Sequence, residues 1–275
     1  MFSFKNLVDS KDRALVMGVL NITPDSFSDG GEAITVSQAL EKLKCLCEQG
    51  ADIIDVGACS TAPMNMLASE EAELSRLKRL LPEIVKNSTV PVSVDTFRPS
   101  VAQYALSEGV SIINDESGIY NIGMAECVKA YGAGWIFMHT GGGSSATEEK
   151  YLQGVVNDVL SFFAEMKRKA LYDGISEDQL CFDCGIGFGK TRQDDLELLS
   201  SCKELSRFSP LLIGASRKRV IGEIVGGKEP KDRLWGSVAV ATIAACNGAG
   251  ILRVHDVKET ADALKVAAAV KRGVL

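Results

Sequence analysis

The chain alternates between short, strongly apolar runs and longer segments with the apolar spacing of helices, and this alternation is what most restricts its fold. The apolar runs have the length and composition of strands that are buried on both faces, as in a parallel sheet. They occupy residues 15–20, 53–57, 91–95, 111–114, 135–138, 180–183, 211–214 and 251–254. The helical patterns lie near residues 35–49, 69–86, 99–107, 124–131, 151–172, 194–205, 232–247 and 260–270.

Eight strand-then-helix units predict an α/β protein with the (β/α)8 TIM barrel fold, in which eight outer helices surround eight parallel strands. The alternative is a doubly wound open sheet, which usually has fewer units and a glycine-rich phosphate loop after its first strand. Here that position holds Asn21-Ile22-Thr23-Pro24-Asp25 instead. No linker or shift in composition divides the chain, so we expect residues 1–275 to form one domain.

Composition and charge exclude several classes of partner. The net charge of −6 argues against non-specific nucleic-acid binding. No apolar segment is long enough to span a membrane, and none resembles a signal peptide. The eight cysteines are scattered, and the Cys181-x-x-Cys184 pair has no second pair to complete a metal site. We therefore expect a soluble, cytoplasmic protein with reduced thiols and with no nucleic-acid or membrane partner.

Polar or charged side chains close every predicted strand. In a parallel barrel the carboxyl ends of the strands meet at one mouth, where the chemistry of such folds is found. Polar groups buried there without partners would cost several kcal/mol, so they must meet one another, water or a ligand. The sequence therefore predicts a site for a polar molecule, lined by Asn21, Asp55, Asp95, Asn114, Asp115, His139, Asp183, Ser216, Lys218, Arg253 and His255.

The middle strands supply groups that suit a flat heterocycle. Asp95 and Asp183 are acceptors, Asn114 is an amide, and Lys218 is a cation. Carboxylates pair with the N–H edge of a 2-aminopyrimidinone, and a lysine can face a ring carbonyl or nitrogen. The alternative is a salt-bridge network that closes the barrel without binding anything.

The first and last strands, which are neighbours in a closed barrel, supply a different set. Arg253 and His255 are two residues apart in a strand and therefore face the same side. Together with Asn21 they predict an anion site. The oxygen of Asn21, with the acidic loop that follows it, suits Mg²⁺, which prefers oxygen ligands and substrate phosphates. Two loops carry an aromatic residue toward this mouth, Phe27 after the first strand and Phe188 in the glycine-rich segment 185–190.

Taken in order, these segments resemble the dihydropteroate synthases over nearly the whole chain. The two most specific motifs are the first, residues 18–31, and the last, residues 253–257. The others are Ser93-Val94-Asp95-Thr96, Ile113-Asn114-Asp115, Met138-His139, Gly187-Phe188-Gly189-Lys190 and Ser216-Arg217-Lys218.

The resemblance implies a (β/α)8 transferase of folate biosynthesis. Such an enzyme joins 6-hydroxymethyl-7,8-dihydropterin diphosphate to 4-aminobenzoate and releases pyrophosphate, and enzymes of this kind often form homodimers. By resemblance, Asn21 is the Mg²⁺ ligand, and Asn21, Asp25, Arg253 and His255 are the catalytic residues. The residues implied to bind the substrates are Phe27, Thr61, Asp95, Asn114, Met138, Asp183, Phe188, Lys218, Arg253, Val254 and His255.

The sequence departs from the family pattern in several places, at residues 140–143, at Cys184 and in one loop near the predicted mouth. Residues 58–64 lack the glutamate and the arginine that the family usually has there, and Ala62 takes the place of the arginine. Two other interpretations therefore stand beside a working synthase. One is a non-catalytic or differently specialised paralogue that binds a pterin. The other is a pterin-dependent methyltransferase barrel, which would not need the loop at residues 21–31 or the anion site.

Overall fold

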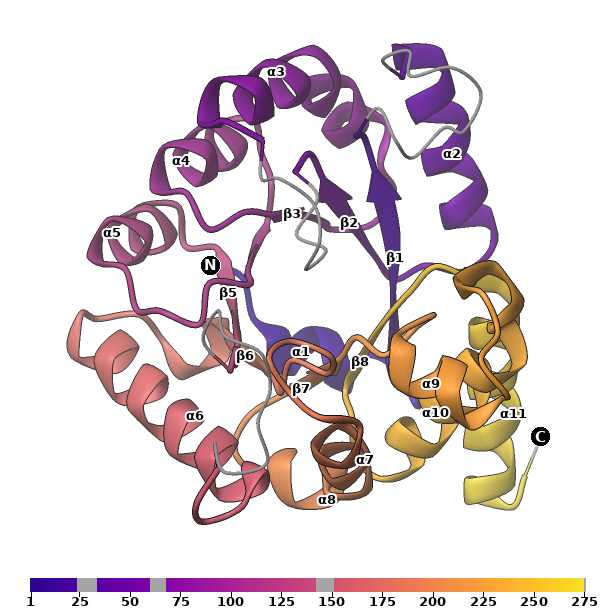
Figure 1. The fold of residues 1–275 in the computed structure, drawn as a ribbon. Coiled ribbons are helices and arrows are strands. Elements are labelled where there is room, and N and C mark those ends of the chain that lie inside the picture. The colour runs from indigo at the N-terminus through magenta and orange to yellow at the C-terminus, as the bar shows by residue number, and fades with distance from the viewer. Residues whose placement is uncertain (24–33, 60–67, 142–150, 275) are drawn as a thin grey trace.

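The computed structural model describes residues 1–23, 34–59, 68–141 and 151–274, and within them the strands form a closed barrel (Figure 1). Each strand pairs in parallel with the next one along the chain, and the last pairs with the first. The strands are β1 (Leu15–Asn21), β2 (Ile53–Gly57), β3 (Val92–Asp95), β4 (Ile112–Asp115), β5 (Gly134–Met138), β6 (Leu180–Asp183), β7 (Leu211–Ile213) and β8 (Ile251–Val254). The predicted (β/α)8 barrel is confirmed.

Helices surround this barrel (Figure 1), and their apolar residues are buried against it. In α3, for example, Leu77, Leu80, Leu81 and Ile84 form the buried stripe, and Ser69 caps the first turn. The outer helices are α2 (Val36–Glu48), α3 (Glu70–Asn87), α4 (Pro99–Ser107), α5 (Ile122–Tyr131), α6 (Val155–Tyr172), α7 (Arg192–Ser200), α8 (Cys202–Leu205), α9 (Arg219–Ile224), α10 (Leu234–Cys246) and α11 (Val257–Arg272). No helix in the described ranges is long and apolar enough to cross a membrane.

The helices differ from the sequence prediction in three places. The predicted helix 194–205 is divided at Ser201 into α7 and α8. The short helix α9 follows β7 and was not predicted. A further helix, α1 (Phe4–Asp9), lies behind the barrel centre in Figure 1 and inserts the fully buried Phe4 among the interior residues Leu15 and Met17. It closes the end of the barrel opposite the predicted site.

Alternation along the strands explains why polar side chains gather at the other end. In β3, Val92 and Val94 belong to the apolar layer between strands and helices, so Ser93 and Asp95 face the barrel interior. The other strands follow the same rule. The interior is apolar near α1 and becomes polar toward the carboxyl ends of the strands.

Candidate active site

Arg253 occupies the centre of the barrel mouth and joins residues from opposite parts of the chain. From β8 its Nε–H donates to Asp55 Oδ2 on β2 at 2.6 Å, and its Nη2 donates to Asp95 Oδ2 on β3 at 3.0 Å. The amide of Asn114 donates to the same Asp55 oxygen at 3.2 Å. The prediction that grouped Arg253 only with the anion-binding residues was therefore incomplete, because two sides of its guanidinium are held by interior carboxylates.

Glu116 also reaches this mouth, although it is not among the residues that the sequence patterns predict there. Its Oε1 lies 4.0 Å from Nη1 of Arg253, and its side chain is only 7% exposed. The signal was present, since Glu116 comes two residues after Asn114 and alternation predicts the same side for both.

Asp95 and Asp55 each keep a buried oxygen that accepts no hydrogen bond within the described part of the chain, in both cases Oδ1. Burial raises the pKa of Asp95 well above its usual value, the nearby Glu116 adds to the rise, and Arg253 opposes it. A buried acceptor left without a donor costs about 1–3 kcal/mol. These two oxygens can therefore accept hydrogen bonds from the N–H groups of a ligand.

Asp183, Lys218 and Phe188 come together on the neighbouring side of the mouth. The backbone N–H of Gly185 donates to Asp183 Oδ1 at 2.7 Å. Burial raises the pKa of Asp183, and Lys218 opposes this. The Nζ of Lys218 donates to the carbonyl of Ile186 and lies 4.5 Å from the centroid of the Phe188 ring. The mouth thus offers a carboxylate, an ammonium and an aromatic face to one ligand.

His255 lies at the rim of the mouth, with Nδ1 3.1 Å from Ser216 Oγ. Its ring surface reaches solvent, yet the surrounding protein and the cations Arg253 and Arg217 lower its pKa to about 4. The ring is therefore neutral at pH 7 in the ligand-free protein. An anion placed beside it would favour the protonated form.

Asn21 ends β1 and packs against Gly57, its partner in the parallel register. A Cβ atom at Gly57 would lie 2.8 Å from Asn21 Oδ1, so this close approach requires glycine. The described residues hold no group of three or more His, Cys, Asp or Glu side chains able to bind a metal. A single amide oxygen fits Mg²⁺, which usually keeps several waters and takes further ligands from phosphates.

Comparisons with known proteins bear on what this mouth binds. A family model described as "Pterin binding enzyme" matches residues 17–255. The dihydropteroate synthase of Synechocystis is 37% identical over 98% of this chain and 94% of its own. That of Escherichia coli K12 is 40% identical over 91% of this chain and 89% of its own. The solved structure of Xanthomonas albilineans dihydropteroate synthase with 4-aminobenzoic acid matches with a TM-score of 0.88, 40% identity and 94% coverage of both chains.

The chain belongs to the dihydropteroate synthase family. The resemblance seen in the sequence is therefore confirmed, and the chain is a transferase of that family. The named relatives are synthases, which favours this interpretation over a methyltransferase barrel.

Some predicted residues of this family member lie elsewhere. Val254 packs in the apolar layer between strands and helices, so its side chain faces away from the mouth and only its backbone is left for a ligand. His139 also turns outward, with Nε2 2.9 Å from Asp158 on α6. Met138, in contrast, does lie at the mouth, because it is the buried last residue of β5 and the register partner of Asp183. Three other predicted site residues, Asp25, Phe27 and Thr61, fall outside the described residues.

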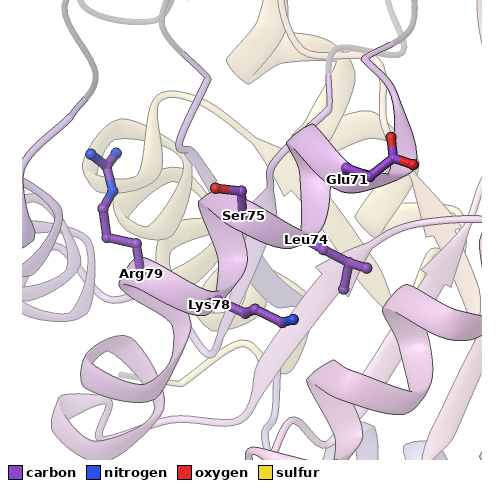
Figure 2. A pocket seen from close by; sticks show the side chains of 5 residues that line it. All are labelled: Glu71, Leu74, Ser75, Lys78 and Arg79. Atoms are coloured by element: carbon purple, nitrogen blue, oxygen red, sulfur yellow. The ribbon is translucent and has the colours of Figure 1, made fainter.

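A surface hollow of about 480 Å³ on α3 does not have the character of a site. Figure 2 shows its side chains, which project from a single helix in different directions. A ligand site needs polar groups that converge on one volume, as they do at the barrel mouth. The lining residues of the hollow are Glu71, Leu74, Ser75, Lys78 and Arg79.

Proposed function

We propose that this dihydropteroate synthase joins 6-hydroxymethyl-7,8-dihydropterin diphosphate to 4-aminobenzoate and releases pyrophosphate. The observation that carries the proposal is that one mouth holds two buried carboxylates, Asp95 bound to Arg253 and Asp183 beside the Lys218 ammonium. Carboxylates without enough cationic partners suit a ligand whose edge is rich in N–H groups, as a 2-aminopyrimidinone is.

The pterin ring is held on the side of the mouth formed by β3, β4 and β6. Asp183 and the Oδ1 of Asp95 accept N–H bonds from the ring, and Lys218 donates to a ring carbonyl or nitrogen. Asn114, fixed by its bond to Asp55, limits the orientations of the ring. Phe188, already against Lys218, adds an apolar face for the flat ligand.

The diphosphate lies on the other side, near β1 and β8. Asn21 ends β1, His255 directly follows β8, and the side chain of Arg253 extends from β8 to the centre of the mouth. Asn21 would hold Mg²⁺, which supplies charge neutralisation for the departing pyrophosphate when bound. His255, neutral in the free protein, gains a proton beside the anion and then donates to it.

In the reaction, the bond between the pterin methylene carbon and the diphosphate oxygen breaks, and its electron pair leaves with pyrophosphate. The lone pair of the arylamine nitrogen forms the new C–N bond, and the nitrogen then loses a proton to solvent. The electron-rich dihydropterin supports the positive charge on the methylene, so no strong protein base is required. By resemblance, Asp25 stabilises that charge, and Phe27 and Thr61 contact the second substrate.

Pyrophosphate release, measured with and without 4-aminobenzoate, tests this function. We expect release that depends on both substrates, with dihydropteroate formed in equal amount. Tight binding of the pterin diphosphate without any release in the presence of 4-aminobenzoate would instead indicate the non-catalytic pterin-binding paralogue.

We also propose that the chain forms a homodimer through α10 and α11, which lie side by side in Figure 1. Trp235 and Ile243 on α10, and Val266 and Val270 on α11, are apolar side chains that are mostly exposed. Apolar groups gathered on adjacent helices usually mark an interface.

A cytoplasmic location is proposed from the state of the cysteines. All of them are among the described residues, and all are free thiols.

A further inference from the structure

Glu116 is a charged side chain in the mouth that the proposed chemistry does not use. It follows Asp115, the last residue of β4, and its side chain is almost fully buried beside the Arg253 guanidinium. A carboxylate is an unexpected neighbour for a substrate that carries a diphosphate, because like charges repel.

The guanidinium of Arg253 has three sides, and each one faces a carboxylate. Nε is bound to Asp55, Nη2 is bound to Asp95, and Nη1 has Glu116 Oε1 at 4.0 Å. The first two carboxylates belong to the barrel interior and are fixed on β2 and β3. Glu116 differs, since it follows the end of its strand and makes the longest of the three contacts. The Nη1 side is therefore the one that an incoming anion can take.

The influence of Glu116 extends across the mouth. Burial dominates the pKa shifts of Asp95, Asp183 and Lys218, but each of these groups also feels the Glu116 carboxylate. Glu116 therefore acts on several groups that line the ligand site, and its negative charge does more than neutralise Arg253.

We propose that Glu116 is a displaceable counter-ion of Arg253, which competes with the phosphate groups of substrate and product for Nη1. The inference rests on the proposed function only in taking Arg253 as a phosphate-binding residue. Glu116 weakens the binding of the diphosphate, and it returns to Nη1 when pyrophosphate leaves. Glu116 therefore affects phosphate affinity and product release. It takes no part in the bonds that form or break.

The test is a substitution of Glu116 that should increase the affinity for pyrophosphate. Structural damage to the mouth would lower this affinity instead. In Glu116→Gln the competing charge is removed at nearly constant size. We expect inorganic pyrophosphate, titrated by calorimetry at a fixed magnesium concentration, to bind about three- to tenfold more tightly than to wild type. Product inhibition by pyrophosphate should strengthen by the same ratio. The affinity for 6-hydroxymethylpterin, which has no phosphate, should stay within about twofold.

Controls separate this effect from other causes. Glu126→Gln, on the exposed face of α5, removes the same charge away from the mouth and should leave pyrophosphate affinity unchanged. Glu116→Asp withdraws the carboxylate by one methylene and should give a smaller increase, and it serves if Glu116→Gln does not fold. Pyrophosphate affinity that is equal or lower in the Glu116 variants overturns the proposal. Failure of wild type to bind hydroxymethylpterin would instead count against the proposed function.

Discussion

Arg253 and Asp55 are 198 residues apart in the chain, and in the folded protein the Nε–H of Arg253 donates to Asp55 Oδ2 at 2.6 Å. With the second contact to Asp95, this ion pair links β8 to β2 and β3 across the barrel interior. The same arginine faces the proposed diphosphate site. It therefore contributes both to the stability of the mouth and to ligand binding.

Arg253→Ala should destabilise the fold as well as weaken phosphate binding. Removing the cation leaves two buried carboxylates without their partner, which typically costs about 3–5 kcal/mol of unfolding free energy. Arg253 also opposes the raised pKa of Asp95, so its loss raises that pKa further. The native state of the variant then binds more protons than the unfolded state above pH 4, and its stability falls more steeply with rising pH than that of wild type.

Urea unfolding of Arg253→Ala at pH 5 and pH 8 measures this. The control is Arg272→Ala, which removes the same side chain from an exposed ion pair with Asp12 and should cost less than about 1 kcal/mol. Equal midpoints for wild type and Arg253→Ala at both pH values would show that the ion pairs contribute nothing to the fold.

His255 should change its protonation when an anion binds. Its pKa is lowered to about 4 in the free protein, first because the surrounding protein removes water from part of the ring and then because Arg253 and Arg217 are close. Between pH 4 and the ordinary value of 6.5 the unfolded state binds more protons, so His255 makes the native state more stable as pH rises through this range. Bound pyrophosphate favours the charged imidazolium and should raise the pKa.

Proton NMR can follow this titration directly, because the chain has only two histidines. The signal of His139 is identified by its loss in His139→Gln. We expect the His255 signal to titrate well below pH 6 in the free protein and to move upward with saturating pyrophosphate. A midpoint near 6.5 that does not respond to pyrophosphate would remove His255 from the anion site.

Trp235→Glu should convert the proposed dimer to a monomer. Trp235 is 76% exposed on α10, and a carboxylate at this position would be buried without a partner in an interface. Sedimentation velocity should show a dimer for wild type and a monomer for the variant. Tyr172→Glu, a change of an exposed aromatic residue at the end of α6, is the matched control. A monomer in wild type would contradict the proposed interface.

Sequence patterns predicted the barrel because each strand and its helix carry their own apolar periodicity. They also predicted which polar residues close the strands: Asp95 is bound to Arg253, Asn114 to Asp55, and Asp183 lies beside Lys218. They did not predict α1, since a helix of six residues is too short for its periodicity to be recognised. The Arg253–Asp55 contact could not be predicted either, because spacing along the chain does not show which residues of distant strands meet inside a barrel.

The central claim is that the mouth has one side for the pterin ring and another for the diphosphate. The most direct measurement is calorimetric affinity for 6-hydroxymethylpterin and for its diphosphate in Asp183→Asn and in His255→Ala. Asp183→Asn removes a charge-assisted contact to the ring and should cost both ligands the same, on the order of 2–4 kcal/mol. His255→Ala should weaken only the diphosphate. Near-wild-type affinity of Asp183→Asn for hydroxymethylpterin, or equal losses for both ligands in His255→Ala, would contradict this account.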